Sequence, residues 1–333
     1  MTQSNAVLVT GGAGYIGSHT CKRLAEAGYL PVTYDNLSTG HADAVRWGPL
    51  VRGDTRDAAA IADAIRAHAP LAVIHFAAAA YVGDSVRDPA FYYDNNVNGM
   101  LGLLTACRET GLSRVIFSSS CATYGVPERL PITEDTPQNP INPYGRTKLI
   151  GEWMLADFAR AHGIRYAALR YFNACGADPD GTLCERHDPE THLLPLALFA
   201  AAGRRAALDL YGTDYPTPDG TCIRDYIHVC DLAEGHLAAL RHLEAGGESL
   251  AVNLGTGTGH SNREVLAAVG RVLGRPVPVN EVARREGDPP ALVADPTHAR
   301  EALGFTARFR DLDATVAHAA RAFGMKFGDD PTP

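Results

Sequence analysis

The sequence predicts an α/β protein built on a doubly wound parallel sheet, with a smaller α/β domain in its C-terminal half. Short apolar stretches alternate with amphipathic ones through the first half of the chain, which is typical of repeated β-α-β units. A glycine-rich turn lies between the first apolar stretch and the first amphipathic one. Beyond residue 175, shorter elements are separated by loops rich in Gly, Pro and Asp. Together these features predict a Rossmann-like arrangement.

The apolar stretches predict the strands, because parallel strands covered by helices on both faces are apolar along their length. Strands are expected at residues 6–12, 31–36, 50–54, 71–78, 114–120 and 166–172. Amphipathic helices are expected near residues 15–27, 57–68, 91–110 and 144–162. A first domain is therefore expected over residues 1–175, completed by segments within 223–255, and a second over residues 176–333.

Composition and charge narrow the class of function. The 333 residues carry a formal net charge of −8 with scattered basic residues, so no nucleic-acid partner is expected. The apolar runs are far shorter than a membrane span, and the first residues lack a secretory signal pattern, so we expect a cytoplasmic protein that binds no membrane. The seven cysteines form no Cys-x-x-Cys pair, which predicts free thiols.

A dinucleotide site is predicted where the first strand ends. Gly11, Gly14 and Gly17 stand at Gly-x-x-Gly-x-x-Gly spacing, which permits a tight turn and brings backbone N–H groups to a pyrophosphate at a helix N-terminus. Asp35 ends the second predicted strand, where a carboxylate accepts hydrogen bonds from ribose hydroxyls and repels a 2′-phosphate. The pattern therefore favours NAD over NADP. Asp54, closing the third predicted strand, is a further candidate on the adenine side.

A catalytic pair is predicted on the helix that begins at Pro143. Tyr144 and Lys148 are four residues apart, so their side chains share one face of that helix. Only three of the 30 basic residues are lysines, and a compact ammonium beside a phenol lowers the phenol pKa toward that of a general base. The fifth predicted strand ends in Ser118–Ser120, at the sheet edge that binds ligands, so one hydroxyl can share the proton of a reacting alcohol.

Seven segments spread over nearly the whole chain carry a family resemblance. They include Thr-Gly-Gly-Ala-Gly-Tyr-Ile-Gly-Ser-His at residues 10–19, Pro-Tyr-Gly-Arg-Thr-Lys at 143–148 and Arg-Asp-Tyr-Ile-His-Val at 224–229. The others lie at residues 92–99, 117–120, 169–173 and 284–288. With these segments the sequence resembles the extended short-chain dehydrogenase/reductase superfamily, and within it the NAD-dependent UDP-glucose (UDP-galactose) 4-epimerases. The resemblance implies C4 epimerisation through a 4-ketopyranose, with transient hydride transfer to tightly bound NAD.

The resemblance also implies a role for each matching residue. Tyr144 is expected to be the base, Ser120 its hydroxyl partner, and Lys148 the residue that binds the nicotinamide ribose. The cofactor is expected to contact Gly11, Gly14, Tyr15, Ile16, Gly17, Asp35, Asn36, Asp54, Thr55, Phe76, Ala77, Asn95, Ser118, Tyr144, Lys148 and Tyr171. The UDP-sugar is expected to contact Ser120, Asn173, His192, Leu193, Tyr211, Arg224, Arg285, Asp288 and Leu292. Residues 1–175 then form the NAD-binding domain and residues 176–333 the UDP-sugar-binding domain.

Two positions depart from the family pattern. Ala80 replaces a lysine that reaches the cofactor in many members, and His192 replaces an asparagine on the sugar side. The segment around Ala80, together with residues 120–125, also resembles epimerases acting on UDP-pentoses (UDP-xylose and UDP-arabinose), so a UDP-pentose substrate stays open. Leu292 stands where family members carry either a bulky aromatic or a small residue. Its intermediate size implies a preference for plain hexoses over N-acetylated ones.

Other functions on the same fold are weighed against these residues. Dehydratases commonly carry Asp-Glu where this chain has Cys121 and Ala122, which argues against dehydration. A net dehydrogenase stays open, because epimerisation is that reaction run forward and back. A non-catalytic NAD-binding regulator is the alternative from another class, but it has no reason to retain Tyr144 with a rare lysine at 148.

Two expectations concern metals and partners. His75, His187 and His192 show no cluster with acids in the sequence, so no metal is expected. The resemblance implies a homodimer, formed through the helices near residues 91–110 and 144–162 packed as a bundle.

Overall fold

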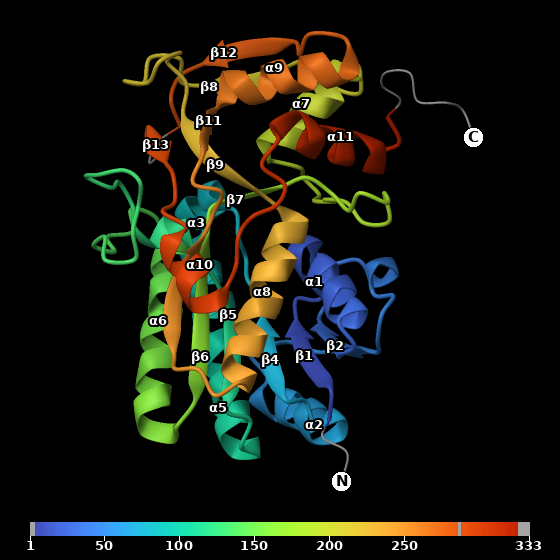
Figure 1. Ribbon diagram of the computed structural model, residues 1–333, viewed down its shortest axis with the longest axis vertical. Coiled ribbons are helices and arrows are strands. Elements are labelled where there is room, and N and C mark those ends of the chain that lie inside the picture. The colour runs from blue at the N-terminus through green and yellow to red at the C-terminus, as the bar shows by residue number, and fades with distance from the viewer. Residues whose placement is uncertain (1–3, 286–287, 326–333) are drawn as a thin grey trace.

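The computed structural model describes residues 4–285 and 288–325, and it is built around a seven-stranded parallel sheet (Figure 1). The strand order is β10-β6-β5-β4-β1-β2-β3, which confirms the predicted doubly wound fold. The strands are β1 (Ala6–Thr10), β2 (Leu30–Asp35), β3 (Leu50–Arg52), β4 (Ala72–His75), β5 (Arg114–Ser120), β6 (Arg165–Tyr171) and β10 (Leu250–Leu254). The order reverses between β1 and β4, and ligands of such sheets bind beyond the carboxyl ends of the strands at this point.

Helices cover both faces of the sheet, because successive residues of each strand are apolar and point in opposite directions. In β1, Ala6 and Leu8 join one buried cluster while Val7 and Val9 join the other. The first cluster lies under α2 (Ala58–His68), α5 (Gly99–Thr110) and α6 (Pro143–His162). The second lies under α1 (Tyr15–Glu26), α8 (Val229–Glu244) and α10 (Thr297–Leu303). Within the described ranges, no helix combines the length and the apolar character that crossing a membrane requires.

The predicted helix near residues 91–110 is interrupted. A short α3 (Val82–Arg87) precedes it, then α4 (Pro89–Tyr92) leads into a π-helical segment, η2 (Tyr93–Asn98), before α5 begins. The periodicity of the apolar residues does not reveal this segment, because a π turn adds one residue without changing composition. The predicted strands at 6–12 and 71–78 are also too long, since β1 ends at Thr10 and β4 ends at His75.

The remaining elements form a smaller layer at the carboxyl edge of the large sheet (Figure 1). One small sheet contains β7 (Asn173–Cys175), β9 (Ile223–His228), β11 (Gly259–Ser261) and β13 (Ala291–Leu292), and a second pairs β8 (Leu208–Tyr211) with β12 (Val279–Val282). A third buried cluster joins α7 (Leu193–Ala201), α9 (Asn262–Leu273) and α11 (Leu312–Ala322). Of the segment 223–255, α8 and β10 pack on or in the large sheet, whereas β9 belongs to the small one. Two 3-10 turns, η1 (Ala42–Ala44) and η3 (Cys121–Thr123), lie in loops.

Candidate active site

The glycine turn between β1 and α1 forms a cradle that side chains would fill. Gly11 has a φ of +73°, a conformation that L residues rarely adopt. A Cβ on Gly17 would lie 2.2 Å from the carbonyl oxygen of Gly11, and a Cβ on Gly11 would lie 2.6 Å from the backbone nitrogen of Ala77. The first turn of α1 contains no acidic residue, so its N–H groups and dipole suit an anion. The cradle fits the pyrophosphate of a dinucleotide.

Asp35 lies at the end of β2 beside this cradle and is buried. Its carboxylate accepts hydrogen bonds from the backbone N–H groups of Ala13 at 3.0 Å and Leu37 at 2.8 Å. A carboxylate has about four acceptor positions, so further positions remain for ribose hydroxyls. The two backbone bonds hold Asp35 in place for that contact.

Asp54 does not close the third strand as expected, because β3 ends at Arg52 and Asp54 lies in the loop after it. The Arg56 guanidinium, 2.8 Å away, holds the pKa of the Asp54 carboxyl below its ordinary value. Asn36 donates to the same carboxylate at 3.2 Å. Thr55 is buried against α5, where a Cβ on Gly99 would lie 2.6 Å from its hydroxyl oxygen. These residues form one polar edge next to Asp35.

Several other predicted cofactor residues lie around the turn. The backbone N–H groups of Phe76 and Ala77 both donate to the carbonyl of Thr10, which places the end of β4 against the turn. Tyr15 begins α1 and donates its hydroxyl proton to the carbonyl of Gly176 at 2.6 Å. The neighbouring Ile16 packs against the apolar cluster under α1 and α8.

Asn95 lies in the π-helical segment, and the neighbouring Asn96 is a residue that the sequence reasoning missed. The buried Asn96 amide accepts from Ala79 N at 2.8 Å and donates to Ala79 O and to the Thr147 hydroxyl, both at 3.0 Å. It therefore ties the loop after β4 to α6, on which Tyr144 lies. The signal for this role is only the Asn-Asn pair at 95–96, which periodicity does not resolve.

Tyr144 and Lys148 are both buried on α6, on the side facing the end of β5. The Lys148 ammonium donates to the carbonyl of Ser118 at 2.6 Å and lies 5.8 Å from the centre of the Tyr144 ring. Burial raises the pKa of Tyr144, and the Ser120 hydroxyl acts against this rise. Burial lowers the pKa of Lys148 to about 7. A desolvated phenol, a hydroxyl and an amine thus lie together at the ligand-binding edge of the sheet.

The three serines at the end of β5 have different partners. Ser118 shares a hydrogen bond of 2.8 Å with the Tyr171 hydroxyl, and Ser119 donates to Glu152 at 2.5 Å. Glu152 also forms a buried ion pair of 2.6 Å with Arg170, a pair that sequence reasoning missed. Ser120 accepts from the backbone N–H of Ala122 at 3.2 Å. Its hydroxyl accepts this backbone bond and still has its proton for a ligand and Tyr144, whereas the hydroxyls of Ser118 and Ser119 are bonded to protein side chains.

The predicted sugar-nucleotide residues come together from separate elements of the smaller layer. The Arg285 guanidinium lies 4.4 Å from the centre of the Tyr211 ring at the end of β8. Arg224, on β9, forms an ion pair of 3.4 Å with Asp288. The aromatic ring of Tyr211 suits contact with a nucleotide base. The guanidinium groups of Arg224 and Arg285 suit the charged oxygens of a diphosphate.

Asn173 and Leu292 lie at the junction of the two layers. Asn173 begins β7, directly after the large-sheet strand β6 and Phe172. Leu292 lies opposite Arg224 in the small sheet and belongs to a buried cluster with Cys121 and Phe172. Because Cys121 follows Ser120, Leu292 lies close to the end of β5.

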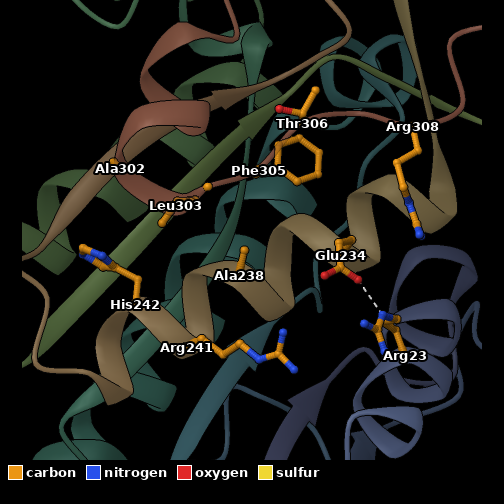
Figure 2. A pocket seen from close by; sticks show the side chains of 11 residues that line it. Arg23, Glu234, Ala238, Arg241, His242, Ala302, Leu303, Phe305, Thr306 and Arg308 are labelled. Atoms are coloured by element: carbon orange, nitrogen blue, oxygen red, sulfur yellow. Dashed lines mark hydrogen bonds and ion pairs between the residues drawn. The ribbon is translucent and has the colours of Figure 1, made fainter.

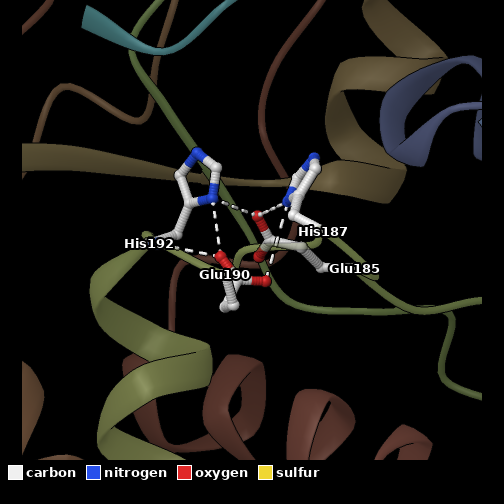
Figure 3. Close-up of side chains that lie close together, drawn as sticks. All are labelled: Glu185, His187, Glu190 and His192. Carbon is white, nitrogen blue, oxygen red and sulfur yellow. Dashed lines mark hydrogen bonds and ion pairs between the residues drawn. The ribbon is translucent and has the colours of Figure 1, made fainter. Parts of the chain in front are cut away.

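His192 and Leu193 stand at the start of α7, where His192 is the residue before the first turn. The expectation that His187 and His192 form no cluster with acids is wrong. The chain folds back before α7 and brings both rings against Glu185 and Glu190 (Figure 3). The spacing Glu-x-His-x-x-Glu-x-His over residues 185–192 was a visible signal. Burial lowers the pKa of His192, but the two carboxylates outweigh this effect and raise it to about 10.

A separate hollow of about 570 Å³ lies among α1, α8, the end of α10 and the segment after α10 (Figure 2). Its lining includes Arg23 and Glu234, which pair across it, and Arg241 and Arg308. It contains none of the predicted site residues. The predicted site residues lie instead at the carboxyl edge of the large sheet and in the smaller layer above it.

Comparisons with known proteins agree with this geometry. The NAD dependent epimerase/dehydratase family matches residues 7–255. The chain is 53% identical over 317 residues to a UDP-glucose 4-epimerase of Rhizobium meliloti (strain 1021), covering 95% of this chain and 96% of that protein. It is similar to the crystal structure of UDP-glucose 4-epimerase from Brucella ovis in complex with NAD, with 63% identity, a TM-score of 0.95 and coverage of 98% and 100%. A UDP-glucose-4-epimerase structure from Stenotrophomonas maltophila, with bound NAD and formylated UDP-arabinopyranose, shows 39% identity, a TM-score of 0.92 and coverage of 95% and 97%.

Proposed function

The chain belongs to the NAD dependent epimerase/dehydratase family, and on this premise we propose that it interconverts UDP-glucose and UDP-galactose by epimerisation at C4. The observation that carries the proposal is the burial of Tyr144, Lys148 and Ser120 together at the edge where the glycine turn also lies. A non-catalytic regulator needs none of the three. The chain is thus an enzyme, an isomerase that uses NAD.

The glycine turn and Asp35 are proposed to hold the NAD. Gly11, Gly14 and Gly17 leave room for the pyrophosphate, and Asp35 accepts from the adenosine ribose hydroxyls. When bound, NAD supplies a reversible acceptor for the hydrogen of C4 together with its electron pair. Its positive charge also lowers the pKa of a neighbouring phenol.

Tyr144 is proposed to take the proton of the C4 hydroxyl and to return it after the 4-ketopyranose has turned over. A buried phenol ionises only with a positive charge nearby, and the nicotinamide of bound NAD together with the protonated form of Lys148, 5.8 Å from the centre of the Tyr144 ring, would supply it. Ser120 shares the proton between the sugar oxygen and Tyr144. The oxidised sugar then exposes its other face to the same cofactor, so both products form without net redox change.

Binding energy for this turnover is proposed to come from the UDP part. Tyr211 and Arg285 hold the uracil side, while Arg224 and Asn173 contact the diphosphate and Asp288 the ribose. Because these contacts leave the sugar ring itself free, the 4-ketopyranose can rotate without escaping. His192, Leu193 and Leu292 border the sugar.

C4 epimerisation of UDP-pentoses is a second candidate. It draws support from His192 on the sugar side and from the loop at residues 77–81, whose Tyr81 ring packs on His192 at 6.1 Å. A pentose lacks the C6 hydroxymethyl group, so it fits any pocket that admits a hexose. Epimerisation of UDP-hexoses remains the main proposal. Comparing the rates with UDP-galactose and UDP-arabinose in the same assay distinguishes the two candidates.

We also propose that the enzyme is a cytoplasmic homodimer. Its seven cysteines are free thiols, as in reducing compartments. Leu101 on α5 and Trp153 on α6 are 46% and 59% exposed, which is large for apolar side chains on adjacent helices. Two copies packing α5 and α6 as a four-helix bundle bury these residues. Trp153→Glu should then shift the mass measured by light scattering from dimer to monomer.

The decisive experiment incubates the purified chain with UDP-galactose and no added NAD. Formation of UDP-glucose without net NADH supports the proposal, and parallel assays with UDP-arabinose and UDP-N-acetylgalactosamine rank the substrates. Stoichiometric accumulation of NADH with an oxidised sugar product would contradict it in favour of a dehydrogenase.

A further inference from the structure

A long connection crosses the cofactor side of the molecule. Residues 176–192, which we name the strap, link β7 to α7. Lys22 on α1 forms an ion pair of 2.7 Å with Asp178, and Arg186 pairs with Asp43 at 2.8 Å. The strap is therefore held at its start and middle against α1 and the loop after β2. Its last nine residues contain the histidines and glutamates at 185–192.

The four side chains converge on one point (Figure 3). The Nδ1 atom of His192 lies 2.8 Å from Glu185 Oε1 and 2.9 Å from Glu190 Oε1. The Nδ1 atom of His187 lies 3.2 Å from Glu185 Oε1 and 3.6 Å from Glu190 Oε2. One donor atom from each residue fits within 4.8 Å of all the others. Ligands of a tetrahedral Zn²⁺ ion, at metal distances of about 2.1 Å, lie roughly 3.4 Å apart, and the four His–Glu separations of 2.8–3.6 Å bracket this value.

Imidazolium–carboxylate pairing accounts for only part of this arrangement. Glu185 Oε1 faces both Nδ1 atoms, so two rings compete for one acceptor. Although His187 Nδ1 is buried and within ion-pair distance, it makes no well-aligned hydrogen bond to any residue that the structure describes. Paired imidazolium groups are normally aligned with their acceptors, whereas an orphaned nitrogen aimed between two carboxylates is what a metal ligand presents.

The burial and the fixed orientation of the two glutamates also favour a bound cation. Glu185 is 4% exposed, and burying it with Glu190 requires compensating positive charge. Backbone N–H groups of Thr191 and His192 donate to Glu190 Oε1 at 2.8 and 2.9 Å, which fixes the orientation of that carboxylate. One divalent ion with two neutral imidazoles balances two carboxylates without any proton on the rings.

We propose that Glu185, His187, Glu190 and His192 bind one Zn²⁺ ion, as a structural site that fixes the end of the strap. Four protein ligands leave no open position, so the ion takes no part in the epimerisation. The ring of His187 lies edge-on to Tyr15 at 6.3 Å and to Tyr81 at 5.8 Å. The site therefore joins the strap to the start of α1 and to the loop after β4, and its loss loosens the wall of the cofactor site.

Cobalt provides the direct test. The full chain, without a histidine tag and freed of metal by a chelator, is titrated with Co²⁺ and then with Zn²⁺. The expected result is the visible absorption of tetrahedral Co²⁺ at about one ion per chain, displaced by Zn²⁺. His192→Asn should weaken binding roughly tenfold or more, whereas His260→Asn, which removes a ring 4.0 Å from Glu264, should not. Absence of the cobalt band, or equal binding by both variants, overturns the proposal.

Two replacements of one residue separate a metal site from an ion-pair cluster. His192→Cys supplies a zinc ligand without a positive charge, and His192→Lys supplies a positive charge without a zinc ligand. Zn²⁺ should raise the thermal unfolding midpoint of the His192→Cys protein and leave that of His192→Lys unchanged. A retained circular dichroism spectrum and a cooperative thermal transition without added Zn²⁺ show that each variant is folded. The reverse order of the two responses, or none from the parent chain, overturns the proposal.

Discussion

The NAD-binding half and the sugar-nucleotide half hold their functional groups in different ways. In the first half, Gly11 lies in the turn after β1, Gly17 lies in α1 and Asp35 ends β2, so the geometry of one β-α-β unit positions them all. In the second half, Tyr211 ends β8, Arg224 lies on β9 of the other small sheet, and Arg285 follows β12, so no single unit positions all three. A change at one residue should therefore disable the first half, while the second half should respond in graded steps.

The largest effect is expected from Tyr144→Phe. The substitution keeps the buried ring but removes the oxygen that takes the proton, so kcat should fall by about 10²–10⁴ while NAD stays bound. Turnover of UDP-galactose and the NAD content of the purified protein are the two measurements. Tyr166→Phe, on the large-sheet strand β6, is the matched control and should keep nearly full activity. Near-normal turnover of the Tyr144→Phe protein would show that another residue acts as the base.

Gly17→Ala should weaken the binding of NAD. The new Cβ would lie 2.2 Å from the Gly11 carbonyl oxygen, and overpacking against backbone costs about 1–3 kcal/mol, so NAD affinity should fall roughly 10- to 100-fold. NAD released by denaturation of the purified protein measures this. For Gly83→Ala the nearest atom is 3.9 Å away, and bound NAD should be unchanged. Equal NAD contents would mean that the turn accommodates a side chain.

Neighbouring arginines offer a matched pair in the second half. Arg285→Ala removes the cation over Tyr211 and should raise KM for UDP-galactose about tenfold with kcat little changed. Arg284→Ala removes a cation that instead stacks on Tyr215 and pairs with Asp214, and it should leave KM within a factor of about two. Steady-state kinetics with each variant decides. Similar KM values for the two variants would show that Arg285 does not contact the nucleotide.

Leu292 should tune the sugar rather than switch the enzyme off. Leu292→Ser opens space in the buried cluster beside Cys121, so it should raise kcat/KM for UDP-N-acetylgalactosamine relative to UDP-galactose. Leu292→Tyr fills that space and should lower the same ratio. Steric selection of this kind is worth about 1–3 kcal/mol, so changes of roughly tenfold are expected. The same ratio in all three proteins places Leu292 outside the sugar pocket.

The smallest effect concerns acid stability of the first half. Burial lowers the pKa of His75 to about 3 and of His236 to about 4. Below about pH 6.5 the unfolded chain takes up protons that the folded chain refuses, so the free energy of unfolding falls between about pH 6.5 and 4. His75→Gln should make this fall shallower in urea titrations. His298→Gln, an exposed position, should keep the parent slope, and identical slopes for both contradict the assignment.

Much of the first half was predictable because short-range patterns carry its geometry. The apolar stretches located every strand of the large sheet up to β6, and the Gly-x-x-Gly-x-x-Gly turn and Tyr-x-x-x-Lys pair each need only one helix or turn to place them. The π-helical segment at Tyr93–Asn98 was missed, because a local change of hydrogen-bonding pattern leaves the apolar period almost intact. Strand ends were wrong by up to three residues, because the stretches of apolar and small residues continue past the last paired residues of β1 and β4.

The sequence by itself determined the doubly wound fold, the glycine cradle and the helix face that carries Tyr144 and Lys148. Only the tertiary structure decided which serine of Ser118–Ser120 is free, because the others are occupied by Tyr171 and by Glu152 from elements distant in the chain. It also decided that His187 and His192 share two carboxylates. Periodicity encodes which face of an element is buried. Which side chains then meet depends on the paths of loops such as the strap, which follow from packing against α1 and the loops after β2 and β4 rather than from any repeat.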